Sequence, residues 1–336
     1  MSRCASPSNS TGTRHDTLYL PTGDVVLSAR STLEDHGLML FRVHKFMMAH
    51  HSSIFKDMFA LPTAVEDCNE SYDGAHLVHM PDSAEDLESL LSVLYDPTRL
   101  PHKCQEFEFV VLGVLKLAIK YEIEPIRKHI ITQVNAAWPS TLEEWDALQK
   151  RSEFIEELRE ESGILCTDAL LPEPVLCIEI ARLVPQDVHI SPVAFYQLSR
   201  TSPHDNWDHA GTGENAFRSA RWDNLRHSDY LRLLRGRETV CNSLAHLEAQ
   251  MRYLAESCQS ISSCLSAYDK IWREIYSEVY KDNDPLRTLC MMDRPGYQPP
   301  DQLCEDCLSE FYEMLGGLRA GMWRAWNRDF ELTGPN

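Results

Sequence analysis

Two cysteines near the C-terminal end of the chain have the spacing of a metal-binding pair. Cys304 and Cys307 are separated by two residues, at the expected start of a helix. A structural zinc site takes four Cys or His ligands, so this pair would be half of one and would need two more thiolates or imidazoles. Cys258 and Cys264, or Cys290, are the residues that the sequence offers to complete it.

Two interpretations of these cysteines compete. On a continuous helix Cys258 and Cys264 would point about 240° apart, too far to bind one ion unless the helix breaks between them. Cys258 also falls on an apolar seam, where a small hydrophobic residue is expected. A lone pair is weak evidence, so the sequence favours buried packing thiols over zinc. Redox chemistry is less favoured still, because no strand precedes the pair.

Other candidates for chemistry lack partners in the sequence. His44 and Lys45 follow an apolar strand with no nearby nucleophile or carboxylate, which favours a structural histidine at a tight junction. The polar segment His204–His209 favours a solvated loop over a metal site. Phosphate-binding glycine loops and the metal-binding and nucleophile motifs of common enzyme families do not occur. We therefore predict no catalytic residues, no cofactor and no enzymatic activity.

The charge excludes further classes of function. The chain has 336 residues and a formal net charge of −19, a balance that repels phosphate backbones and anionic lipid. Arg221–Arg237 is the one arginine-rich segment, and we interpret it as a solvated helix face. The longest apolar run, Phe109–Leu115, is far shorter than the ~20 residues of a membrane span. Neither nucleic-acid nor membrane binding is expected.

The N-terminal residues and the cysteines predict a compartment. Residues 1–16 are rich in Ser and Thr and lack the apolar stretch of a secretory signal, which predicts a disordered tail. The eleven cysteines are scattered, which predicts reduced thiols. We expect a soluble intracellular protein, cytoplasmic or nuclear.

The secondary structure expected to position these residues changes along the chain from strands and helices to helices alone. Val25–Ala29 and Leu38–Val43 predict a hairpin, and helical periodicity begins at Lys45. From about residue 140 onward the pattern is helical. Gly236–Pro285 contains no internal Gly or Pro and carries an apolar heptad seam that includes Cys258, Ile261 and Leu265. Ser257–Ser263 is a point at which this long helix could break.

Five segments in order resemble a BTB/POZ domain. They are Asp24–Leu27, Phe41–Lys45, Ser52–Phe59, Met80–Tyr95 and Leu115–Tyr121. The resemblance implies an α+β fold, a small sheet packed on a helical cluster, followed here by an all-α domain. We divide the chain into a tail at 1–16, a BTB/POZ domain at 17–138 and a helical domain at 139–336.

The resemblance also implies protein–protein interaction. Such domains often form homodimers through their first helices, with a buried Asp at the opening strand and charge at the strand–helix junction. In this sequence the corresponding core and dimer residues are Asp24, His44, Lys45, Phe46, Met47 and Met48. Many members also dock on a cullin and act as ubiquitin-ligase adaptors, so a cullin is a candidate partner.

A looser resemblance covers nearly the whole chain. Fungal proteins with a BTB module and a helical C-terminal region often contain a CxxC and a Trp-rich end, as at Cys304–Cys307 and Trp323–Leu332. The sequence thus supports two hypotheses. The first is a homodimeric scaffold or adaptor, and the second is a zinc-stabilised helical protein in which the BTB part only dimerises.

Overall fold

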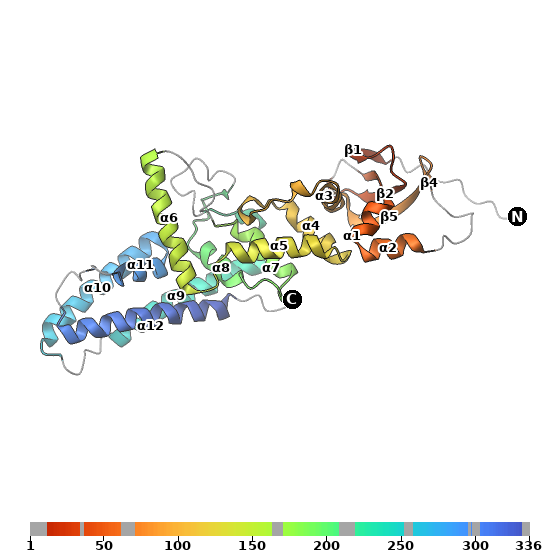
Figure 1. Ribbon diagram of the computed structural model, residues 1–336. Coiled ribbons are helices and arrows are strands. Elements are labelled where there is room, and N and C mark those ends of the chain that lie inside the picture. The colour runs from red at the N-terminus through yellow and green to blue at the C-terminus, as the bar shows by residue number, and fades with distance from the viewer. Residues whose placement is uncertain are drawn as a thin grey trace. The chain divides into compact units, whose positions relative to one another are not determined.

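The computed structural model describes residues 12–33, 37–61, 71–162, 171–207, 219–251, 258–294, 297 and 303–330. The chain forms two compact units, Met1–Gln133 and Val134–Asn336. The first is a mixed sheet with helices and the second is helical (Figure 1). The predicted α+β architecture with a helical continuation is therefore confirmed. Within the described ranges, no helix has both the length and the apolar character of a membrane-spanning segment.

A mixed sheet lies in the first unit, with five strands in the described residues. Its strands are β1 (Thr13–Tyr19), β2 (Val25–Arg30), β3 (Leu38–Val43), β4 (Ser71–Tyr72) and β5 (Ala75–Ser83), in the spatial order β1-β3-β2-β5-β4. Strands β2 and β3 pair antiparallel, which confirms the predicted hairpin. Its turn, residues 34–36, lies outside the described residues. Strand β2 also pairs parallel with β5 and is therefore central, which explains its nearly continuous apolar sequence.

Local capping signals define the helices of this unit. The helices are α1 (Lys45–His51), α2 (Ser53–Ala60), α3 (Ala84–Tyr95), α4 (Val110–Lys120) and α5 (Glu124–Ala137). Ser83 caps α3 by accepting a hydrogen bond from the Asp86 N–H at 3.1 Å. Ser52 caps α2 in the same way and also donates to the Tyr121 carbonyl at 2.6 Å. Ser52 thereby fixes the start of α2 against the end of α4.

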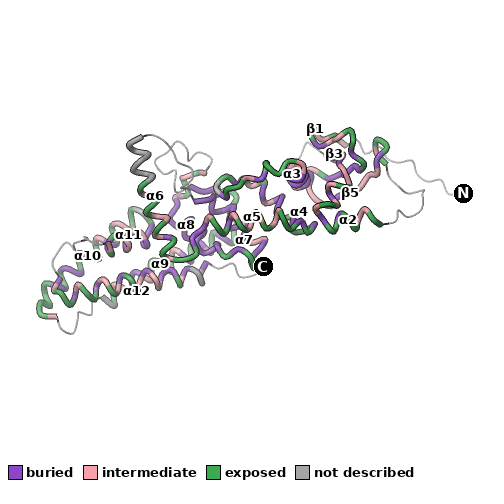
Figure 2. The backbone as a smooth tube through the Cα atoms, viewed as in Figure 1, coloured by how far each residue is buried: buried purple, intermediate pink, exposed green. Residues whose placement is uncertain are grey.

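The second unit consists of helices in its described residues. They are α6 (Leu142–Ser162), α7 (Pro174–Leu183), α8 (Ser191–Ser199), α9 (His227–Met251), α10 (Ile261–Asp282), α11 (Pro285–Met292) and α12 (Glu305–Asp329). Every residue of α8 is buried, and α7, α9 and α12 pack against this helix (Figure 2). Tyr196 on α8 stacks on Trp326 of α12, with ring centroids 3.9 Å apart, and its hydroxyl donates to Asp284 at 2.5 Å.

Two sequence predictions about element boundaries are wrong. Thr13–Asp16 belong to β1, so the predicted tail at 1–16 is too long; residues 1–11 lie outside the described residues. The predicted seam is also out of register at the start of α10, where Ile261 is 59% exposed and Leu265 is 39% exposed. The chain is not helical just before Ile261, so the seam fails at the start of α10, whereas its later residues Tyr268, Trp272 and Ile275 are buried as the seam predicts.

Candidate functional site

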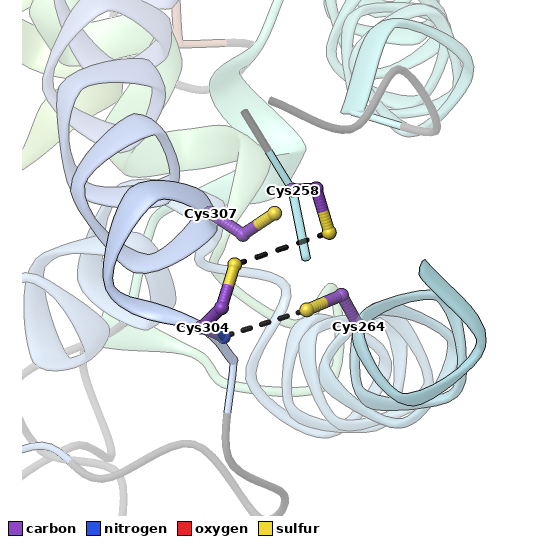
Figure 3. Close-up of side chains that lie close together, drawn as sticks. All are labelled: Cys258, Cys264, Cys304 and Cys307. Atoms are coloured by element: carbon purple, nitrogen blue, oxygen red, sulfur yellow. Dashed lines mark hydrogen bonds between the residues drawn. The ribbon is translucent and has the colours of Figure 1, made fainter. Parts of the chain in front are cut away.

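Four cysteine thiols lie together at one end of the helical unit. Cys264 is in the first turn of α10, and Cys258 lies three residues before that helix. Cys304 is the residue that precedes α12, and Cys307 is in the first turn of α12. All four Sγ atoms lie within 4.8 Å of one another, and those of Cys258 and Cys304 are 3.9 Å apart. Figure 3 shows the four sulfurs pointing toward a common centre.

Backbone groups of the helix start contact the sulfurs. The Cys304 N–H donates to the Cys264 sulfur at 3.4 Å. Interaction with the Cys307 N–H lowers the pKa of the Cys304 thiol to about 7. The Cys304 N–H likewise lowers the pKa of Cys264, but burial and the sulfurs of Cys304 and Cys258 outweigh it, so that this pKa is raised. The first turn of α12 thus favours at least one thiolate in the cluster.

The break before α10 brings the two pairs together. In the described residues α9 ends at Met251, and Cys258 is not helical. No continuous helix joins Cys258 to Cys264, which is the condition under which the sequence allows the two thiols to bind one ion. Cys290, the other candidate, lies on α11 and is not part of the group.

A second candidate region is the junction between β3 and α1 in the first unit. The Lys45 N–H donates to the Asp24 carboxylate at 2.7 Å, which gives the start of α1 an acceptor from the chain just before β2. The His44 ring contacts the Tyr95 hydroxyl at 2.9 Å through Nδ1 and the Thr22 hydroxyl at 3.0 Å through Nε2. The His44 N–H also donates to Tyr95 at 2.9 Å. These bonds give His44 a positioning role at the junction.

Helix α1 presents one aromatic side chain to solvent. Met48 is fully buried, and Met47 is half-buried. Phe46 is 77% exposed, and its ring stacks on that of His50 with centroids 5.8 Å apart. An exposed aromatic ring next to a second flat ring is typical of a contact surface.

An apolar cavity of about 270 Å³ opens beside α1 in the same unit. Its walls come from the end of α1, the end of α3 and the start of α5, and include His51, Leu94, Leu100, Ile126 and His129. Burial, together with the charge of His50, lowers the pKa of His51, so its imidazole is neutral near neutral pH. The lining of the cavity is mostly apolar, so it would accept an apolar side chain.

Residues 23–136 match the model of the BTB/POZ domain. These residues are a BTB/POZ domain. The match covers the sheet from β2 onward and α1 to α5, and it ends before the helical unit with the cysteine cluster begins its own helices. No curated protein matches the chain.

The BTB/POZ domain differs from expectation at Asp24. Its side chain was expected to be buried, but Asp24 is exposed in the single chain. The residue lies where the chain enters β2, and it is held by the Lys45 N–H at its carboxylate and by its own N–H, which donates to the Val43 carbonyl at 3.0 Å. Tyr95, whose hydroxyl organises the junction, carries no such signal in the sequence, because helical periodicity marks it only as a residue of the apolar face of α3.

Two other sequence candidates lie in the helical unit. Asp208 and His209 of the polar segment lie outside the described residues. The arginine-rich segment is not a fully solvated face, because three of its arginines, Arg221, Arg232 and Arg237, are half-buried. Arg232 donates to the buried Asp229 at 2.6 Å, and Arg237 donates to the Ser199 carbonyl at 2.9 Å. The bond of Arg232 lies within α9, and that of Arg237 joins α9 to the end of α8.

Proposed function

We propose that the protein is a non-enzymatic interaction protein whose BTB/POZ domain self-associates through α1. The observation that carries the proposal is the exposure of Phe46 on a short helix that is otherwise fixed by buried contacts. The family supports protein–protein interaction as the general role of such a domain. The occupant that we propose for this surface is α1 of a second copy.

The geometry of α1 suits a self-complementary contact. In a two-fold interface each residue contributes twice, so one exposed ring on each copy gives two buried rings. Met48 and the Lys45–Asp24 hydrogen bond hold the helix in one orientation, so little order would be lost on association. His50 provides a flat partner on the same face, and half-buried Met47 can adjust its shape to a partner surface.

Sedimentation velocity of the full chain tests self-association. The expected result is a dimer in the wild type and a shift toward monomer in Phe46→Ala. Val110→Ala is the matched control, because Val110 is a 52% exposed apolar residue of the same unit on another helix. Wild-type protein that stays monomeric at all concentrations, or a Phe46→Ala variant that associates as well as Val110→Ala, would refute the proposal.

A finer proposal concerns a cullin ubiquitin ligase as a further partner. The apolar cavity between α1, α3 and α5 supports it, because 270 Å³ accommodates one large apolar side chain of a partner helix. Ile126→Asp places a charge at the cavity wall, away from the exposed ring of Phe46. We expect it to abolish capture of a purified cullin while leaving the dimer intact. This role would be excluded if the wild type and the Ile126→Asp variant captured the cullin equally well, or if the wild type captured none.

A further inference from the structure

The cysteine cluster has a geometry that packing does not explain. Packing thiols are expected to lie against apolar side chains, whereas these four sulfurs lie against one another. Cys264 and Cys307 are buried, but Cys258 and Cys304 are only half-buried. Cysteines that only fill a hydrophobic core would be expected to be fully buried. The partial exposure of Cys258 and Cys304 therefore requires another explanation.

The spacing fits a tetrahedral metal ion. A Zn–S bond is about 2.3 Å long, so the sulfurs of a tetrahedral site lie about 3.8 Å apart. The Cys258–Cys304 distance of 3.9 Å matches that value, and every other sulfur pair lies within 4.8 Å. Movement of about 1 Å at most would close the site.

The surroundings of the sulfurs favour thiolates. Cys264 and Cys307 each lie in the first turn of a helix, where unpaired N–H groups carry partial positive charge. The Cys304 N–H already donates to the Cys264 sulfur at 3.4 Å, a type of bond that orients and stabilises metal-bound thiolates. Behind the cluster, the buried Tyr268 hydroxyl donates to the Cys307 carbonyl at 3.0 Å and fixes the turn.

We propose that Cys258, Cys264, Cys304 and Cys307 bind one Zn²⁺ ion as a structural site. Four thiolates fill a tetrahedral shell and leave no position for water or substrate, so the ion has no catalytic role. The ion joins the start of α10 to the start of α12. It thus provides a cross-link between the two helices where reduced thiols form no disulfide. This proposal is independent of self-association by the BTB/POZ domain.

Metal analysis of the full chain, purified under reducing conditions, tests the proposal. We expect one zinc per chain, and replacement of zinc by Co²⁺ should give the sulfur-to-cobalt charge-transfer bands of a tetrahedral thiolate site. Cys264→Ser should lose the metal, while Cys241→Ser, which changes an exposed cysteine of the same unit, should retain it. Loss of the metal should lower the Tm of the helical unit by on the order of 10 °C.

A second measurement uses only wild-type protein, so it tests the proposal even if the Cys264→Ser variant does not fold. Titration with a mercurial that modifies thiols, in the presence of a zinc-sensitive dye, should release one zinc as the cluster is modified. Three results would overturn the proposal: reduced protein that binds neither zinc nor cobalt, iron in place of zinc, or zinc that persists in Cys264→Ser. A disulfide among the four cysteines, detected as a two-hydrogen mass loss in protein kept under reducing conditions, would also overturn it.

Discussion

Replacement of Asp284 should destabilise the helical unit more than any surface change. Asp284 is fully buried just before α11, and its carboxylate accepts hydrogen bonds from a hydroxyl, a guanidinium and a backbone N–H. The donors are the Tyr196 hydroxyl at 2.5 Å, the Arg200 guanidinium at 2.5 Å and the Arg287 N–H at 3.1 Å. Arg200 is itself buried, and its guanidinium lies 4.6 Å from the centre of the Trp145 ring.

The size of the effect follows from these contacts. Asp284→Ala leaves a buried guanidinium without its carboxylate, which costs about 3–5 kcal/mol. Loss of the helix cap costs about 1 kcal/mol more. Arg200 keeps two side-chain acceptors, Gln149 and Gln197, each at 2.7 Å, which limits the total. We expect the free energy of unfolding to fall by about 4–5 kcal/mol for Asp284→Ala. Asp284→Asn keeps an acceptor oxygen, so its loss should be about half.

Tryptophan fluorescence during chemical unfolding measures this effect selectively. All seven Trp residues lie between Trp138 and Trp326, so the signal comes from the helical unit alone. Asp293→Ala, which changes an exposed carboxylate at the other end of α11, is the control and should shift the free energy by less than about 0.5 kcal/mol. A loss below about 1 kcal/mol for Asp284→Ala would refute the assignment of Asp284 as the acceptor of a buried charge.

Two further predictions concern the same unit and the same fluorescence signal. Gly236→Ala should lower the free energy of unfolding by about 1–2 kcal/mol despite its better helix propensity, because the added Cβ overlaps the buried Phe330 ring; an unchanged or higher value would contradict this. Burial raises the pKa of Glu153, but hydrogen bonds and charges from Arg294 and Arg287 outweigh it, so the folded-state pKa lies below its ordinary 4.5. Glu153 therefore contributes stability above pH 4.5 that is lost as the pH falls through the folded-state pKa, and Glu153→Gln should flatten this acid dependence; an unaltered slope would show that the arginines do not act through Glu153.

Local signals predicted most of the first unit. The hairpin of β2 and β3 follows from strand patterns that a short turn separates, and the start of α3 follows from Ser83 with acidic residues behind it. These features depend on neighbours in sequence, so a single sequence contains the information. The BTB/POZ resemblance rests on several such segments in order, and the family match at 23–136 agrees with it.

Tertiary effects account for the predictions that were wrong. The heptad seam treats α9 and α10 as one helix, whereas the chain breaks before Ile261; Ile261 and Leu265 are therefore exposed, although Tyr268, Trp272 and Ile275 on the same seam are buried. Burial of Asp24 was expected from the family and is not provided by the single chain. Tyr95 could not be recognised as a partner of His44, since the two are 51 residues apart in sequence.

The cysteine cluster shows the same limit most clearly. The spacing of Cys304 and Cys307 is visible in the sequence, but Cys258 and Cys264 join them only because the chain turns before α10. The serine-rich stretch from Ser257 to Ser263 is the one local signal of that turn. Proximity in space, which sequence spacing does not encode, converts a weak pair into a complete tetrahedral set.

Native mass spectrometry of the full-length protein tests the central claim most directly. The account of an interaction protein that self-associates through its BTB/POZ domain predicts a dimer of two 38.5 kDa chains, and the proposed metal site predicts two bound zinc ions in that dimer. A dimer that becomes monomeric in Phe46→Ala would support self-association through α1. A monomer at every concentration would contradict it, whatever the metal content.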